Sequence, residues 1–127
     1  MELRGVEGYR RVYYYEYNAA KNGAVGERPI EGDPIAAGTI ILAGHIEIRE
    51  PFVGDAALTL SLMRPGDIWQ SGPGFLSSLS GAGSVVPCPL PPPGFIRCLV
   101  QGARPILGVA GEPLTRGVFV LALEGVG

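Results

Sequence analysis

Residues 44–63, GHIEIREPFVGDAALTLSLM, decide the fold class of the chain. Before and after VGD, apolar residues recur at every second position. Side chains two residues apart point to the same face of a β-strand, so this alternation predicts two strands joined by a tight turn, a β-hairpin. On the first strand we expect an inner face made of Ile40, Leu42, Ile46 and Ile48. On the second we expect Leu58, Leu60 and Leu62 on the face opposite to Ala57, Thr59, Ser61 and Met63.

The only histidine of the chain, His45, falls on the same strand face as Glu47 and Arg49. A histidine beside carboxylates can act as a general base, but it then needs a nucleophile or a metal ion, and the sequence offers no strong candidate for either. A strand face that meets solvent or a partner explains the three residues more simply. We therefore predict that they belong to a partner interface and not to a catalytic site.

Strand signals continue on both sides of this stretch. Residues 9–17, YRRVYYYEY, alternate with period two, and the segments FIRCLVQG, RPILGVAG and GVFVLALEGV are three further candidates. Both faces of the last segment are apolar, which predicts a central strand. The 20 Gly and 12 Pro residues punctuate these runs, so turn signals recur about every ten residues. The pattern predicts an all-β fold of about seven to nine strands, which would be an antiparallel sandwich, a jelly-roll-like fold or a small barrel.

Residues 1–37 are expected to form an extended N-terminal arm, and residues 38–127 a β domain. Residues 18–37 are rich in Gly, Pro and charges without an apolar period, so they indicate an extended segment and not a helix. In the strand before them, one face is formed by Tyr9, Arg11, Tyr13, Tyr15 and Tyr17. Tyr rings suit interfaces, so this face is predicted to bind a partner; packing on the chain's own core, or stacking on sugars or bases, are the alternatives.

The sequence offers little other chemistry. The net charge of −2 and the scattered basic residues argue against binding nucleic acid or an anionic membrane. No apolar run reaches the roughly 18 residues of a membrane helix, and the first residues lack the apolar core of a signal peptide, so synthesis in the cytoplasm is expected. Cys88 and Cys98 have no further soft ligand nearby; they could form a disulfide or stay as two buried thiols. We predict no catalytic, metal or cofactor site, because no nucleophile elbow or phosphate loop is present.

Three aspartates, Asp33, Asp55 and Asp67, each lie beside Gly or Pro. An aspartate in such a place usually accepts hydrogen bonds from the backbone of its own turn. We therefore expect these residues to hold turns, and nothing in the sequence supports a calcium site at any of them.

Basic and amide residues are used unevenly. The chain has nine Arg but one Lys, and only two Asn and two Gln. Amides degrade when heated, so this bias suits a thermophilic source and predicts a thermostable protein. A GC-rich genome would give the same bias in Arg, Gly, Ala and Pro, and is the alternative.

From residue 33 on, the order of the segments resembles that of small virion proteins of tailed bacteriophages. The resemblance rests on DPIAAGTIILAGHIEIREPFVGDAALTLSL, on the Gly-rich stretch after it, and on GVFVLALEGV near the C-terminus. In these proteins a strand with the pattern G-x-x-I-x-x leads to an E-x-F turn and an L-T-L strand. Several of them are head-decoration proteins, and others belong to tails or fibres.

The resemblance implies an all-β protein that often forms homotrimers. It implies a non-enzymatic role in the virion: binding the outer surface of a capsid, contacting the major capsid protein and reinforcing the contacts between coat subunits. The alternative is a tail- or fibre-associated β-sandwich module that binds carbohydrate or the cell surface. A solvent-exposed Trp69 with carboxylates nearby would favour that alternative.

Overall fold

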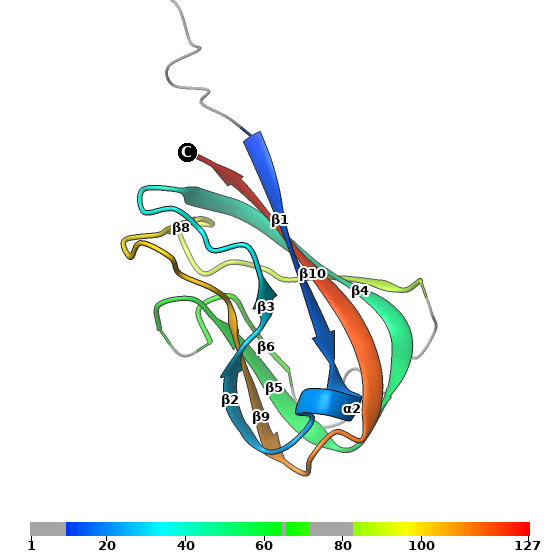
Figure 1. Ribbon diagram of the computed structural model, residues 1–127. Coiled ribbons are helices and arrows are strands. Elements are labelled where there is room, and N and C mark those ends of the chain that lie inside the picture. The colour runs from blue at the N-terminus through cyan, green and yellow to red at the C-terminus, as the bar shows by residue number, and fades with distance from the viewer. Residues whose placement is uncertain (1–9, 65, 72–82) are drawn as a thin grey trace, which may run out of the picture.

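The computed structural model describes residues 10–64, 66–71 and 83–127 of the chain. The regular secondary structure of these residues consists of strands, apart from one helix of a single turn (Figure 1). In chain order the elements are β1 (Arg10–Asn18), α2 (Ala19–Asn22), β2 (Gly26–Pro29), β3 (Glu31–Gly32), β4 (Ile40–Val53), β5 (Ala56–Ser61), β6 (Trp69–Gln70), β7 (Val85–Pro87), β8 (Ile96–Arg97), β9 (Ile106–Gly111) and β10 (Arg116–Val126).

The strands form two antiparallel sheets whose inward side chains share one hydrophobic core. The larger sheet has the order β3-β1-β10-β4-β7, with β8 also paired to β4, and the smaller sheet has the order β2-β9-β5-β6. This architecture confirms the all-β, antiparallel prediction. The prediction that the last strand is central is also confirmed, because β10 lies between β1 and β4.

Strands are paired from the two ends of the chain inwards. β1 pairs with β10 along its nine residues, from Arg10 opposite Val126 to Asn18 opposite Val118. β2 pairs with β9, β4 with β7, and β5 with β6, so the two halves of the chain run beside each other like a long hairpin that has been rolled up. Residues 10–18 are therefore a full strand of the larger sheet. The division into an arm at 1–37 and a domain at 38–127 stays a prediction about independent folding.

β4 and β5 lie in different sheets, so the hairpin predicted for residues 44–63 is wrong. The reason is that both edges of β4 are occupied: β10 pairs along one edge, and β7 and β8 pair along the other. At Gly54 and Asp55 the chain instead crosses to the smaller sheet, where β5 pairs with β9 and β6. Gly54 has φ of +132°, and a Cβ there would lie 2.8 Å from the carbonyl oxygen of Pro113, so the crossing requires glycine. The predicted faces of β5 are confirmed, since the buried residues are Leu58, Leu60 and Leu62.

The inner face of β4 was predicted correctly at Ile46 and Ile48 but not at Ile40 and Leu42. Ile41 is fully buried, whereas Leu42 is 40% exposed. The register with β10 shifts between the pairs Gly125–Ile41 and Glu124–Ala43, which leaves Leu42 as an extra residue on β4. At such a β-bulge the alternation of side chains shifts by one residue, so residues of one parity face inwards before the bulge and outwards after it. A period-two pattern extended across the bulge therefore assigns the wrong face to the residues beyond it.

The sequence predicted that residues 18–37 are extended throughout, but the structure differs. Asn18 ends β1 and caps α2, because its side-chain oxygen accepts a hydrogen bond from the backbone N–H of Ala20 at 3.0 Å. The chain then turns into β2, on the edge of the smaller sheet, and into β3, on the edge of the larger one. This short segment therefore joins the two sheets at one side of the molecule.

Asp67 holds the turn between β5 and β6, as expected for an aspartate beside Gly66. Its buried carboxylate accepts hydrogen bonds from the backbone N–H groups of Leu62 at 2.6 Å, Met63 at 2.9 Å and Arg64 at 3.1 Å. Three donors to one carboxylate satisfy both of its oxygens inside the protein. The role predicted for this residue is confirmed.

Candidate assembly surfaces

The residues predicted to bind a partner are divided between the two faces of the larger sheet. Tyr9 lies outside the described residues. Tyr13, Tyr15 and Tyr17 point inwards and are 6%, 0% and 4% exposed, so all three rings belong to the chain's own core. The predicted tyrosine interface is therefore wrong for these residues, and the alternative of core packing holds. The reason is that β1 lies over the smaller sheet, which covers its inward face.

Polar ends of these buried rings are satisfied locally. The hydroxyl of Tyr15 donates to the carbonyl of Asp33 at 2.6 Å, and that of Tyr17 to the carbonyl of Asn22 at 2.8 Å. Burial raises the pKa of Tyr17 to about 12 and raises that of Tyr15 further, beyond its usual range. Tyr17 also packs against Phe119, with ring centroids 5.1 Å apart. These tyrosines pin β1 and the segment after it to the sandwich.

Arg11 stays exposed at the end of this face. Its guanidinium lies 3.3 Å from the carboxylate of Asp33 and 4.7 Å from the centroid of the Tyr13 ring. Both contacts are made within the chain, and they place the Arg11 side chain against the exposed end of the row Tyr13, Tyr15 and Tyr17.

The outward face of the larger sheet carries His45, Glu47 and Arg49, as their shared strand face predicted. His45 is exposed and lies across from Ala122 of β10 and Pro87 of β7. The guanidinium Nε of Arg49 donates to the carboxylate of Glu47 at 2.7 Å. The two side chains are 58% and 44% exposed, so this ion pair contributes about 0–1 kcal/mol at most to stability. Solvent-facing geometry of this kind suits a surface that meets a partner.

Sequence reasoning missed the apolar residues of this outward face. Tyr14 on β1 is 62% exposed and Val85 on β7 is 60% exposed. The half-buried Val120 lies on β10, next to β1, and β4 separates it from β7. The parity of residues 9–17 already placed Tyr14 on the face opposite to the other tyrosines. The signal was therefore present, but the longer row of four tyrosines drew the prediction to the wrong face. We call the surface formed by Tyr14, Val85 and Val120 together with His45, Glu47 and Arg49 the outer face.

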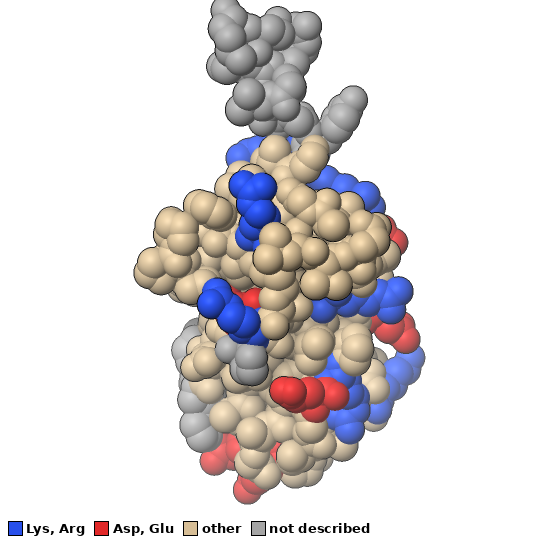
Figure 2. Space-filling view, turned by 90° about the vertical axis from the view of Figure 1, so that its left-hand side faces the viewer, with Lys and Arg blue, Asp and Glu red and all other residues tan. Residues whose placement is uncertain are grey.

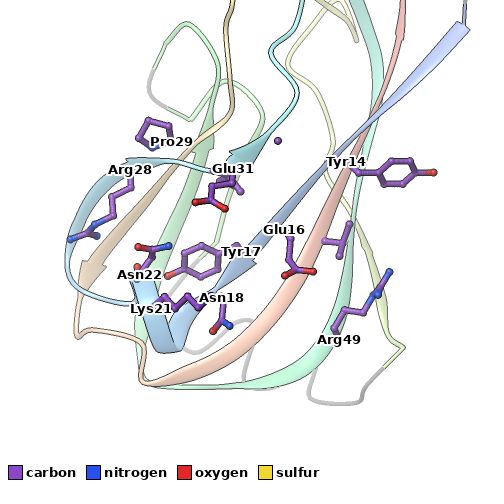
Figure 3. A pocket seen from close by; sticks show the side chains of 13 residues that line it. Tyr14, Glu16, Tyr17, Asn18, Lys21, Asn22, Arg28, Pro29, Glu31 and Arg49 are labelled. Carbon is purple, nitrogen blue, oxygen red and sulfur yellow. Dashed lines mark hydrogen bonds between the residues drawn. The ribbon is translucent and has the colours of Figure 1, made fainter.

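A polar groove lies beside the outer face, between β1, α2 and the segment that carries β2 and β3 (Figure 3). In Figure 3, Arg28 and Lys21 line one side of it and Tyr14 and Arg49 the other, with Glu16 and Asn18 between. Its volume is about 590 Å³. The lining mixes both signs of charge and holds no His, Cys or Ser. Across residues 10–64, 66–71 and 83–127, no group of three His, Cys, Asp or Glu side chains could hold a metal ion.

Cys88 and Cys98 are free thiols buried in the core. Burial raises the pKa of Cys88 to about 12, so its reactive thiolate is suppressed at neutral pH. Trp69 is also buried, at 7% exposed, so the exposed tryptophan that would favour a carbohydrate-binding module is not found. Within the described part of the chain, no helix is both long and apolar enough to cross a lipid bilayer.

Two solved structures share this fold over nearly the whole chain. One is a chain in the acidic stable capsid structure of Helicobacter pylori bacteriophage KHP30, with a TM-score of 0.69 over 95% of this chain and 90% of that one, at 6% identity. The other is a chain in the capsid asymmetric unit of cyanophage Pam1, with a TM-score of 0.67 over 100% of this chain and 91% of that one, at 14% identity. No known protein family and no curated protein matches the sequence. At these identities, the likeness establishes a common fold.

Proposed function

We propose that this chain is a non-enzymatic structural protein of a tailed-phage virion. In this role it binds the outer surface of the capsid as a homotrimer, contacts the major capsid protein and reinforces the contacts between coat subunits. It is made in the cytoplasm of the host and then joins the particle. The bias towards Arg and away from amides suits a capsid that must survive high temperature.

The observation that carries the proposal is the fold shared with chains of two phage capsid structures. The likeness covers 95–100% of this chain and 90–91% of the others, so it concerns complete folds and not one common substructure. The resemblance of the sequence to small virion proteins, drawn from its strands and turns, points in the same direction.

The strand order supports the proposal independently. Without β3 and β8, the sheets read β1-β10-β4-β7 and β2-β9-β5-β6, and the chain crosses between the sheets at every connection except that from β5 to β6. This is the order expected of an eight-stranded jelly roll, an architecture found in viral capsid and lectin domains. The alternative of a carbohydrate-binding module has no further support, because Trp69 is buried.

The outer face is the surface that we assign to contacts in the assembly. It presents Tyr14, Val85 and Val120 together with His45, Glu47 and Arg49, a mixture of ring, aliphatic and charged groups that is typical of protein interfaces. This face can therefore meet a neighbour without any unfolding of the chain. Tyr13, Tyr15 and Tyr17 have no place in this interface because they fill the core.

The proposal is tested with particles of the encoding phage that lack this protein. Purified protein is added back, binding is followed by co-sedimentation, and its position is located by electron microscopy. Release of DNA on heating is recorded with a fluorescent dye. We expect binding at the outer surface and release at a higher temperature in the decorated particles, with light scattering giving a trimer mass for the free protein.

A matched pair of variants tests the outer face in the same assay. The double substitution Tyr14→Ser/Val85→Ser should leave the fold intact and weaken trimer formation or binding to particles. The control is Val25→Ser, which alters another exposed apolar residue, 52% exposed, away from that face. The proposed function is wrong if the native protein does not bind the particles, or if it co-purifies with tails instead of heads.

A further inference from the structure

A second concave surface adjoins the polar groove at Pro29 and lies where the segments after β5 and β8 meet the start of β9. Its floor is formed by Leu62 and Met63, which follow β5, and by Ile106 at the start of β9. Leu99 and Val100, in the loop after β8, form one wall. The volume is about 670 Å³. We call it the apolar groove.

Leu99 and Val100 are unusually exposed for neighbouring aliphatic residues, at 72% and 57%. Their loop is nevertheless held in place by short hydrogen bonds. The backbone N–H of Cys98 donates to the carbonyl of Thr39 at 2.7 Å, and the N–H of Gly38 donates to the carbonyl of Cys98 at 2.6 Å. Figure 1 shows this loop, in yellow to orange, beside the cyan loop that precedes β4. The structure therefore presents an apolar wall in a fixed position, and contiguous apolar surface of this kind commonly marks a binding site.

Two arginines at the apolar groove have no ion-pair partner among the described residues. Arg104 lines it and Arg64 follows Met63, and within the described residues neither guanidinium has a carboxylate within 4 Å. Arg11, Arg49 and Arg116, elsewhere on the molecule, each have one. Figure 2, which faces the side of the molecule that is on the left in Figure 1, shows mostly tan surface in its upper half, with more blue side chains than red.

Two carboxylates near this groove already have partners within the chain. Asp67 lies beneath the floor, where its oxygens accept the N–H groups of Leu62, Met63 and Arg64. Asp33, next to the lining residue Pro34, is bridged to Arg11 at 3.3 Å. Arg64 and Arg104 are therefore open to carboxylates supplied by a partner.

We propose that the apolar groove binds a short peptide segment of the coat protein in which aliphatic side chains alternate with Asp or Glu. The aliphatic groups would cover Leu99, Val100 and Met63, and the carboxylates would pair with Arg64 and Arg104 at the rim. The identity of the partner rests on the proposed function; the chemistry of the peptide rests on the groove alone.

Two other classes of partner fit less well. Single-stranded nucleic acid is bound through aromatic rings on which bases stack, and the lining of this groove contains no aromatic side chain. A membrane surface is met by a convex apolar tip, whereas Leu99 and Val100 form the wall of a concavity with Ile106 and Met63 below it. A peptide uses the wall, the floor and the charged rim together.

The test uses a library of random twelve-residue peptides displayed on filamentous phage and panned against the full-length protein. We expect enriched peptides to combine Leu, Ile or Val with Asp or Glu. Synthetic versions, measured by fluorescence anisotropy, should bind at least tenfold more weakly to Leu99→Ser/Val100→Ser and to Arg64→Glu/Arg104→Glu. The matched controls Val25→Ser and Lys21→Glu, which alter an exposed valine and an exposed cation elsewhere, should bind as the native protein does.

The possible outcomes separate this inference from the proposed function. Enrichment of basic peptides, of no peptide, or only of peptides that bind the groove variants unchanged would overturn it. Binding of oligonucleotides or anionic vesicles that is lost in Leu99→Ser/Val100→Ser would overturn it in favour of those partners. If the native protein binds particles and the groove variants bind them equally well, the inference about the coat protein fails while the proposed function stands. If the native protein fails to bind particles, the proposed function fails and the peptide panning still decides the chemistry of the groove.

Discussion

The two faces of the larger sheet differ more than their sequences suggest. Tyr13, Tyr15 and Tyr17 are almost inaccessible on the inward face, while Tyr14, between two of them in sequence, is 62% exposed on the outward face. All four residues belong to one strand and have similar intrinsic preferences for it. What separates them is the neighbouring sheet: it covers one face of β1 and leaves the other open. The same side chain therefore acts as core on one face and as potential contact surface on the other.

The largest expected difference is between substitutions at Tyr15 and Tyr14. Tyr15→Ala removes a fully buried ring and its 2.6 Å hydrogen bond to Asp33, and we expect a loss of about 3–5 kcal/mol of unfolding free energy. Tyr14→Ala should change it by less than about 0.5 kcal/mol, because the ring is mostly in solvent. Urea unfolding followed by circular dichroism measures both. Equal losses at the two positions would mean that the faces are not distinguished as described.

A second comparison tests how closely the inward face is packed. A Cβ at Gly117 (φ +131°) would overlap the ring of Phe52, whereas a Cβ at Gly38 (φ +90°) would meet no atom within 4 Å. Gly117→Ala should therefore destabilise the protein by about 2–4 kcal/mol, from overpacking and backbone strain together. Gly38→Ala should cost about 1 kcal/mol from the backbone alone. If the two variants unfold at the same urea concentration, the core near Phe52 can yield to an added methyl group.

Alkaline pH provides a third test, because burial in the core raises the pKa values of thiol and phenol groups that titrate at high pH. Burial raises the pKa of Cys88 from 9.0, and that of Tyr17 from 10.0, to about 12 in each case. As pH rises, these groups lose their protons in the unfolded chain before they do so in the folded protein. Their contribution to the free energy of unfolding is therefore complete below about pH 9 and is lost progressively towards pH 12. Each group should lower stability by about 1.4 kcal/mol per pH unit between its two pKa values.

Cys88→Val should remove the Cys88 share of this slope between about pH 9.5 and 11.5. Urea unfolding at several pH values measures it. Val86→Ala serves as the control, since it alters a buried neighbour on β7 that does not titrate and should lower stability without changing the slope. An unchanged slope in Cys88→Val would show that the thiol ionises as readily in the folded protein as in the unfolded one.

The smallest effect is expected on the outward face, at the ion pair of Glu47 and Arg49. Glu47→Gln should lower stability by less than about 1 kcal/mol, and 0.5 M NaCl should abolish the difference, because exposed charges are screened. Glu112→Gln removes an exposed carboxylate that has no ion-pair partner among the described residues and should have no measurable effect. A loss of several kcal/mol at Glu47 would indicate that this face is buried in the unfolding species, for example by self-association.

The sequence predicted the strands well and their partners poorly. Period-two alternation identified β1, β4, β5 and β10, and their two faces except at Ile40 and Leu42 of β4, because that period is local and follows directly from strand geometry. It could not identify which face of β1 is buried, since tyrosine occurs on both faces. Which face is buried depends on the smaller sheet, whose strands are distant from β1 in the sequence. The same pattern also assigned β4 and β5 to one hairpin, since the turn at Gly54 is equally suited to a crossing between sheets. The bulge at Leu42 needed the register of β10, which no local pattern contains.

The candidate surfaces were predictable to a lesser degree. The shared face of His45, Glu47 and Arg49 follows from parity alone, and the structure places all three on the outer face. The apolar groove was not predicted, because it combines residues near positions 62, 100 and 106 that only the fold brings together. Its single sequence signal was the pair of aliphatic residues Leu99–Val100 between turn residues, which is too common a pattern to be informative by itself.

The pairing of β1 with β10 has a consequence for how the protein is made. About a hundred residues separate these strands, and β10 must insert between β1 and β4 before the larger sheet is complete. Ribosomes add roughly 5–20 residues per second, so on the nascent chain β1 waits about 5–20 seconds with its tyrosine rings uncovered. During that interval an unpaired strand edge and a row of rings are open to aggregation. Because the strand that completes the larger sheet is synthesised after the other described strands, we expect yield in the cell to depend on chaperones and growth temperature more steeply than the stability of the finished fold would suggest.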